Sequence, residues 1–343
     1  MSGRLLQRSL YGAGGVLLFL ALASVFLLTI GKPPLVTLAT MVGYAFGDAY
    51  SVSESLVKAT PILFCALAVI LPARLGLITV GGEGQLYLGA LLGTAVVVNY
   101  PGAPMFVLLP AMLALGAAGG AIWSGLAGML RARFQVNETI STLLLNYIAV
   151  LLVNFAVYGA WKDPASLGWP ATIQFPPSAT VPSLLGTRVH MGFIVALIAA
   201  IVLHIAVTQT RWGLELKVLA GNRKVGAMVG LRFARNTLIV MALGGALAGF
   251  AGICETSAIQ GRLQSGLSVG YGLTGFLVAW LSGQHFLRAV PIAILIGGLI
   301  VAGDALQLYS KIPSASATVL QGLLFAAALA ASGLAVRREA RRA

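Results

Sequence analysis

Long apolar stretches recur along the whole of this 343-residue chain. Each is about 17–25 residues long, the length that a helix needs to cross a hydrocarbon layer of ~30 Å. Hydrophobic residues make up 59% of the sequence and charged residues only 9%, whereas soluble domains contain roughly 45–50% and about 25%. So few charges cannot cover a water-facing surface, and most of the chain must therefore face lipid or other apolar helices.

The backbone of a spanning segment has no water to bond, so it forms either a helix or one strand of a closed barrel. The apolar runs are continuous and do not alternate with period two, which excludes the barrel. We therefore predict an all-α integral membrane protein with about ten transmembrane helices. The predicted spans are residues 11–31, 57–72, 76–99, 105–130, 138–160, 191–208, 236–255, 267–283, 289–308 and 315–335.

The distribution of basic residues predicts the orientation. With the N-terminus inside, the inside segments hold sixteen of the 22 Lys and Arg residues, and such residues accumulate on the cytoplasmic side of membrane proteins. We expect both termini in the cytoplasm, and the net charge of +13 then reflects topology and not nucleic-acid binding. The other six basic residues fall in outside segments: Lys32, Lys58, Lys162, Arg188, Arg262 and Lys311.

The first apolar run follows Arg4 and Arg8 and resembles a signal peptide in this respect. Tyr11 to Ile30 is nearly long enough to span, so we expect it to be retained as the first helix. The whole chain, 1–343, is then a single transmembrane domain.

Two hydrophilic segments interrupt the apolar pattern. Residues 159–190 are rich in proline, carry Trp161 and Trp169, and are predicted to form an irregular outside loop. Residues 211–235 form the largest inside segment, which Gly221-Asn222 divides into two short amphipathic helices. Such helices lie on lipid headgroups or dock into a groove on a cytoplasmic partner, and composition does not choose between the two.

Two of the predicted spans, 76–99 and 267–283, are interrupted by glycines. Each is the second member of a set of four spans, and the two sets enter the membrane in opposite senses. This pairing is typical of inverted-repeat transporters with broken helices. The glycines are Gly76, Gly81, Gly82, Gly84 and Gly89 in the first span, and Gly266, Gly270, Gly272 and Gly275 in the second.

Glu83 lies nine residues past Arg74, which places it ~13 Å into the membrane at a rise of ~1.5 Å per residue. An ionisable group at such a depth costs at least ~2.5–3.5 kcal/mol and faces a cavity or the bundle interior. Two interpretations remain open. Gly82, Glu83 and Gln85 could line a substrate pathway at a bend, or Glu83 could cap the second half-helix or bond a neighbouring helix.

Asn137-Glu138 opens the fifth predicted span, where Asn137 suits an N-cap and Glu138 suits the positive end of the helix dipole. Asn146 and Asn154 lie deeper in the same span. Buried amides in a membrane usually bond another helix, and the alternative is that both line the pathway.

The other polar residues suggest no further chemistry. Cys65 and Cys254 each lie inside an apolar run and are expected to be small buried hydrophobes. Glu255 and Asp304 fall near predicted outer ends, where a salt bridge or a solvated position accounts for each. His204 and His285 have no ligand-spaced partners, so no metal site is predicted. No nucleotide-binding GxxxxGK[ST] motif occurs, so any ATP must be bound by another polypeptide.

Three segments together resemble a known family. Residues 77–85 read LITVGGEGQ and resemble the pattern LNIGVEGQ, and residues 136–149 read VNETISTLLLNYIA and resemble VNEVISTIMLNYIA. Residues 213–231 resemble the looser pattern G…LRAVGxNxxAAxxxGI. The chain thus resembles the ABC importer permeases of the branched-chain amino acid/simple-sugar superfamily, and within it the nucleoside branch that works with basic-membrane-protein-type lipoproteins. The departures are Thr79 for Asn, Ala220 for Gly, and Gly226 for Ala.

The resemblance covers about residues 50–330 and implies a mechanism. Two permeases, identical or different, pair in the bacterial plasma (inner) membrane, two cytoplasmic ABC ATPases bind below, and an external binding protein delivers a nucleoside or purine base. The chain itself then holds no cofactor and catalyses nothing. Residues 211–235 become the segment that couples the ATPase to the membrane helices, with these residues at the contact: Gly221, Asn222, Val225, Gly226, Met228 and Gly230.

Two other functions compete with this one. A permease for ribose-like or other simple sugars shares the same architecture. An ion-coupled secondary transporter would also contain broken helices and an intramembrane carboxylate, but it would not need the inside amphipathic segment.

Overall fold

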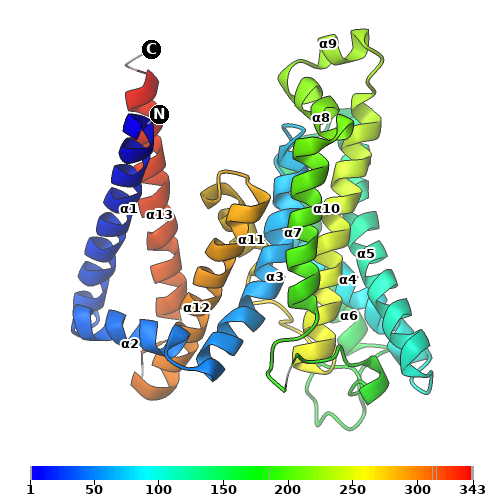
Figure 1. The fold of residues 1–343 in the computed structure, drawn as a ribbon. Helices are drawn as coiled ribbons and strands as arrows, with labels where there is room; N and C mark the ends of the chain where they lie inside the picture. The colour runs from blue at the N-terminus through cyan, green and yellow to red at the C-terminus, as the bar shows by residue number, and fades with distance from the viewer. Residues whose placement is uncertain (1, 185, 311, 314, 341–343) are drawn as a thin grey trace. The chain divides into compact units, whose positions relative to one another are not determined.

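The computed structural model describes residues 2–184, 186–310, 312–313 and 315–340, and most of them are helical (Figure 1). Lys311, which the sequence assigns to an outside segment, lies outside the described residues. The helical elements are α1 (Ser2–Thr29), α2 (Pro34–Phe46), α3 (Ala49–Ala73), α4 (Gly82–Asn99), α5 (Met105–Phe134), α6 (Glu138–Tyr158), η1 (Pro177–Ala179), α7 (Gly192–Gln209), α8 (Arg211–Gly221), α9 (Arg223–Met228), α10 (Phe233–Glu255), η2 (Thr256–Gln260), α11 (Tyr271–Leu281), α12 (Phe286–Ser310) and α13 (Ala315–Ala340).

The all-α membrane class is confirmed, and a helix occupies each of the ten predicted spans. By length and composition, however, only six helices of the described chain could cross a membrane, or seven if the bent pair α1–α2 counts as one span. The count falls below ten because α4 and α11 are shortened by non-helical stretches and α4 begins with a polar turn. The described apolar part of α13 is also short, Ala315–Ala331.

The sequence did not predict α2. This helix begins at Pro34, a residue suited to the first turn of a helix, and runs at 109° to α1. Gly31 has a φ of +71°, which accounts for the sharp change of direction between the two helices. At thirteen residues α2 is too short to span by itself.

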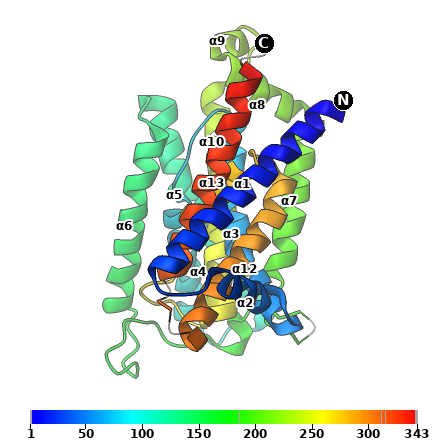
Figure 2. The same cartoon turned by 90° about the vertical axis from the view of Figure 1, so that its left-hand side faces the viewer.

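The chain divides into two compact units. The first contains the described parts of Met1–Ala59 and Ile294–Ala343, and the second is Thr60–Ala293. In the first unit α1 crosses α13 (Figure 2), and α2 packs beside them through the buried side chains of Met41 and Ala45. Within this unit Lys58 and Asp304 form an ion pair at 4.0 Å, as the sequence suggested for Asp304.

In the second unit α4, α5 and α10 form the closest-packed part of the bundle. A Cβ atom at Gly89 would overlap the backbone of Gly249, and one at Gly120 would overlap the carbonyl of Gly245. Small residues let membrane helices approach closely where no hydrophobic force drives them together. These glycines therefore allow α4, α5 and α10 to pack backbone against backbone.

The second unit has two different ends (Figure 1). Helices α8 and α9 lie at one end, where Ala220 approaches the turn after α3 at Gly76. The described residues of 159–190 lie at the opposite end and pack against the irregular stretch after η2, with Thr172 N–H donating to the Leu263 carbonyl at 2.9 Å. The two hydrophilic segments thus lie at opposite ends of the helices, as the predicted topology requires.

Candidate functional site

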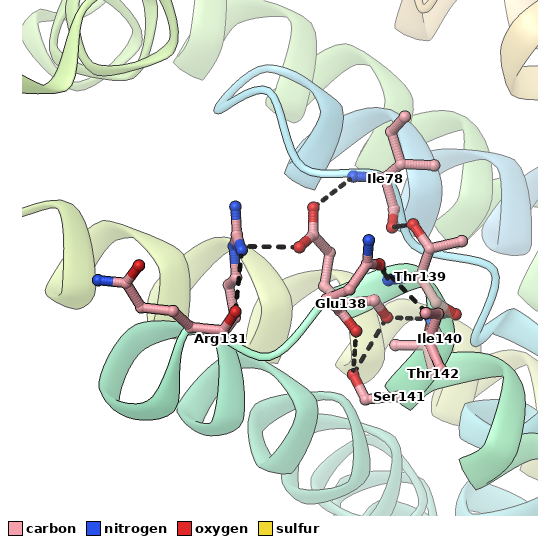
Figure 3. A network of polar contacts seen from close by, with 9 residues as sticks. Ile78, Arg131, Glu138, Thr139, Ile140, Ser141 and Thr142 are labelled. Carbon is pink, nitrogen blue, oxygen red and sulfur yellow. Dashed lines mark hydrogen bonds and ion pairs between the residues drawn. The ribbon is translucent and has the colours of Figure 1, made fainter.

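The stretch before α4 is not helical, and side chains of α6 bond its backbone instead. Glu138 Oε1 accepts from the Ile78 N–H at 3.2 Å, and Thr139 Oγ1 donates to the Ile78 carbonyl at 2.8 Å (Figure 3). Residues 77–81 have no helical hydrogen-bond pattern. Their backbone groups must find other partners within a membrane, and the first turn of α6 supplies them.

The same arrangement continues one and two turns further along α6. Thr142 Oγ1 accepts from the Val80 N–H at 3.2 Å, and Asn146 Nδ2 donates to the Val80 carbonyl at 2.8 Å. Asn146 Oδ1 accepts from the Gly84 N–H, also at 2.8 Å. Positions four apart share one face of a helix, so Glu138, Thr142 and Asn146 present one polar row to residues 78–84. We call this set of bonds the α4–α6 joint.

The beginning of α6 is itself held from two sides. Asn137 Oδ1 accepts from the backbone N–H groups of Thr139 and Ile140, which confirms the predicted N-cap. Glu138 is buried and forms an ion pair with Arg131 Nε at 3.1 Å (Figure 3). The sequence predicted only a helix-dipole role for Glu138, and its bond to residue 78 was missed because that contact joins segments sixty residues apart.

Glu83 reaches from the first turn of α4 to the beginning of α11. Its Oε2 accepts from the Gly272 N–H at 2.7 Å. The free N–H groups at the start of a helix favour a carboxylate. The structure therefore gives Glu83 the second of its two predicted roles, a bond to a neighbouring helix. Contact with substrate stays a prediction.

The glycines around Glu83 are required by close contacts. A Cβ atom at Gly82 would lie 3.2 Å from the Gly272 Cα, and one at Gly84 would lie 2.9 Å from Asn146 Oδ1. The glycine-broken beginnings of α4 and α11, which the sequence paired as counterparts, thus meet in space. The inverted repeat itself stays a prediction.

The five predicted pathway residues do not all gather at one point. Gly82, Glu83 and Asn146 take part in the contacts between α4, α6 and α11. Gln85 is buried beside Gly81, whose Cβ would lie 2.9 Å from the Gln85 amide nitrogen. Asn154 lies two turns beyond Asn146, and its Oδ1 has no hydrogen-bond partner among the described residues.

Sequence reasoning missed the tyrosines of this region. The Tyr87 hydroxyl accepts from the Ser268 N–H at 3.4 Å, and the Tyr271 hydroxyl donates to Glu255 Oε1 at 3.4 Å. Glu255 is buried, so the expectation of a solvated position is wrong. The signal was available in part, because Tyr87 lies four residues after Glu83 and shares its helix face.

The predicted division of the 211–235 segment is confirmed. Helix α8 ends at Gly221, and Asn222 Oδ1 caps α9 by accepting from the N–H groups of Lys224 and Val225. A Cβ atom at Gly226 would lie 2.6 Å from Leu219 Cδ2, so glycine in place of the family's alanine allows α9 to pack tightly on α8. Gly230 lies in the turn after α9 and has a φ of +81°.

The tip of this segment presents apolar side chains to solvent. Met228 is 84% exposed, and Val225 and Val229 are also exposed. We call these three residues the α9 apolar edge. They stand among the basic side chains of Arg223 and Lys224 at the end of the unit.

At the opposite end, residues 159–190 cover the π-helical turn η2. Ser257 Oγ donates to the Ala179 carbonyl at 2.6 Å and accepts from the Val181 N–H at 3.0 Å. His190 closes this segment in a buried position, where Nδ1 accepts from the Gly192 N–H at 3.2 Å. Burial lowers the pKa of the His190 imidazole to about 4.

Residues 51–329 match the family described as the permease component of the branched-chain amino acid transport system. The chain belongs to this family. The matched region contains the α4–α6 joint, the α9 apolar edge and the 159–190 segment at the other end, and the predicted resemblance to ABC permeases is confirmed.

Three relatives align with this chain over most of its length. A glucose ABC transporter permease of Haloferax volcanii is 32% identical over 320 residues, which cover 90% of this chain and 84% of the relative. A guanosine ABC transporter permease of Bacillus subtilis is 31% identical over 274 residues, 78% of each chain. A nucleoside ABC transporter permease of Lactococcus lactis, NupB, is 26% identical over 289 residues, 81% of this chain and 78% of the relative. The permease is thus a multi-pass membrane transport subunit.

Proposed function

We propose that this permease is the translocation subunit of an ATP-driven importer for nucleosides or purine bases in a bacterial plasma membrane. It pairs with a second permease subunit, two separate cytoplasmic ATPase subunits bind it, and an external binding protein delivers the substrate. The observation that carries the proposal is the α9 apolar edge, which stands on a capped two-helix segment at the basic end of the second unit.

The α9 apolar edge is shaped for a protein partner. Val225 and Met228 lie on a helix of six residues, and Val229 follows directly at its C-terminal end. Asn222 caps this helix, Gly226 packs it on α8, and Gly230 follows it with a positive φ. Short isolated helices are marginal in water, so this rigid support holds the edge in one position. A helix that lies on a lipid surface would carry a continuous apolar face, whereas only three apolar side chains make up this edge. The ATPase is therefore the partner that we assign to the edge.

The predicted topology gives this edge a cytoplasmic location. The same end of the unit carries Arg74, Arg131 and the basic residues of the 211–235 segment, and cytoplasmic segments are enriched in Lys and Arg. The 159–190 segment then faces outward, where Trp169 and Leu167 are exposed at the surface offered to a binding protein. Both chain termini are assigned to the cytoplasm on the same grounds.

The substrate assignment rests on the relatives. Two of them carry guanosine or nucleoside in their names. The second candidate is a simple sugar, which the 32% identical glucose permease favours. Competition in uptake by nucleosides, purine bases, pentoses and glucose separates the two. Nucleosides or bases are expected to compete at the lowest concentrations, and competition by sugars alone would refute the assignment.

The energy source has its own test. Uptake into vesicles that contain the whole transporter is expected to require ATP and to continue in the presence of a protonophore. Uptake that stops with the protonophore and is indifferent to ATP would establish the ion-coupled alternative and overturn the ABC assignment.

Docking at the α9 apolar edge is tested by Met228→Asp, with Met228→Leu as the matched control. Burying a charge in an apolar contact is costly, so the aspartate variant is expected to co-purify with at least about tenfold less ATPase. The leucine variant retains an apolar side chain and is expected to bind normally. Full co-purification and substrate-coupled hydrolysis in Met228→Asp would show that the edge does not contact the ATPase.

A further inference from the structure

A polar cavity opens within the 211–235 segment, and none of the three side chains of the α9 apolar edge lines it. It has a volume of about 590 Å³ and lies between the first turns of α8 and α10. Trp212, Glu215, Arg232, Arg235 and Asn236 supply its polar lining. This volume falls within the range of ~300–1,000 Å³ typical of small-ligand sites.

Two of the side chains that line the cavity bond each other, whereas its charged side chains do not form ion pairs with one another. Trp212 Nε1 donates to Asn236 Oδ1 at 3.0 Å, and Asn236 is buried. Arg232 and Arg235 form no ion pair with another described residue, Glu215 included. The lining therefore carries two guanidinium groups and one carboxylate, a net charge of +1.

On the predicted topology, the cavity lies where the chain leaves the membrane. Helix α7 ends at Gln209, just before Trp212, and the apolar part of α10 begins just after Arg235. Ile239 lines the membrane side of the cavity, and Leu238 and Leu243 on the same helix are exposed. Tryptophan and arginine at this level are characteristic of the lipid headgroup region.

We propose that this cavity binds the headgroup of an anionic phospholipid such as phosphatidylglycerol. Arg232 and Arg235 would bond the phosphodiester oxygens, a geometry for which guanidinium groups are suited. Glu215 would accept from the glycerol hydroxyls, and the acyl chains would lie along the exposed apolar side chains of α10. The single negative charge of the headgroup matches the net charge of the lining, and basic pockets at the cytoplasmic ends of membrane helices bind such lipids.

The test is retention of lipid by the purified transporter complex, measured by native mass spectrometry after exchange into detergent with added phosphatidylglycerol or phosphatidylcholine. The Arg232→Gln/Arg235→Gln double variant is expected to retain at least about tenfold less phosphatidylglycerol, because charge-assisted bonds are lost. The matched control is Arg211→Gln/Lys217→Gln, which removes the same charge from exposed positions of α8 outside the cavity. It is expected to retain phosphatidylglycerol within about twofold of the parent, by the same affinity arithmetic.

Three results would overturn the proposal. Equal losses in the two double variants would show a general effect of charge. Thermal stabilisation by inorganic phosphate that disappears in the Arg232/Arg235 variant, with lipid retention unchanged, would assign the cavity to a free anion. Normal lipid retention combined with loss of the ATPase would make the cavity part of the ATPase contact. Retention is measured on the intact complex, so the result does not depend on the transported substrate.

Discussion

Asn146 makes two hydrogen bonds with the non-helical backbone before α4, and Asn146→Ala removes both. The Val80 carbonyl and the Gly84 N–H, each bonded at 2.8 Å, lose their partner. Gly84 is buried, and nothing else in the joint reaches its N–H. The substitution also removes the side chain against which Gly84 packs.

The expected cost follows from these two bonds. Interhelical hydrogen bonds in membrane proteins contribute on average ~0.6 kcal/mol and at most ~1.7 kcal/mol each. Leaving a buried backbone group unsatisfied costs ~1–3 kcal/mol. Asn146→Ala is therefore expected to destabilise the permease by about 1–3 kcal/mol, most of it local to residues 77–84.

Asn154→Ala is the matched control, because the same residue type lies two turns further along α6 and its Oδ1 has no bond to a described residue. The assays are unfolding of the purified protein and residue-resolved hydrogen exchange. For Asn146→Ala, exchange of the Gly84 amide is expected to rise about 5–150-fold, the equivalent of 1–3 kcal/mol. For Asn154→Ala it is expected to stay within about twofold. Unchanged protection of the Gly84 amide, or an equal loss of stability in the two variants, would show that the Asn146 side chain does not hold the backbone before α4.

Three further predictions concern packing, pH and Glu83. Gly120→Ala is expected to abolish correctly folded protein, because its Cβ would overlap the α10 backbone. The control is Gly125→Ala on the same helix, whose Cβ meets nothing within 4 Å and which should be neutral or stabilising by up to ~1 kcal/mol. Equal yields of folded protein from the two variants by size-exclusion chromatography would contradict this. Burial lowers the pKa of His190 from 6.5 to about 4, so the unfolded protein binds this proton more readily than the folded protein does. The stability of the fold is therefore unaffected by this histidine above pH 6.5, and it falls by roughly 3 kcal/mol as the pH drops towards 4. Melting curves of the parent and of His190→Gln between pH 7 and 4 measure this, and parallel curves would exclude it. Glu83→Gln keeps an acceptor for the Gly272 N–H, and its melting temperature is expected to lie closer to that of the parent than the melting temperature of Glu83→Ala does. Glu83→Ala is expected to lower the free energy of unfolding by about 1–3 kcal/mol. Equal melting temperatures of the two variants would show that this hydrogen bond does not stabilise the fold.

Much of the architecture follows from the apolar runs of the sequence and from the glycines and helix-capping residues between them. The apolar runs locate a helix in each predicted span, and the glycines after Arg74 locate a non-helical stretch before α4. Asn137 and Asn222 both act as N-caps, as their type and place in the sequence indicate. These features are local, because a helix, a break or a cap depends on residues within a few positions of each other.

Helix lengths and bends were less predictable. The number of helices able to span by themselves is lower than the apolar runs suggest, because α4 and α11 begin only after stretches bonded to other elements. The bend between α1 and α2 depends on one turn at Gly31 and on packing within the first unit. Hydropathy reports the composition of a segment and does not locate the residue at which a helix begins or ends.

The glycine-broken span with its buried carboxylate shows where the two kinds of information divide. The sequence by itself determined that Glu83 must avoid lipid and that the chain around it departs from a helix, since both follow from the cost of burying charge and from glycine's weak helix propensity. Only the tertiary structure decided that Glu83 bonds the beginning of α11 and that Asn146 holds the backbone at residues 80 and 84. The physical reason is that backbone groups freed from a helix inside a membrane must be bonded by some other segment. Which segment does so depends on the surfaces that meet in three dimensions.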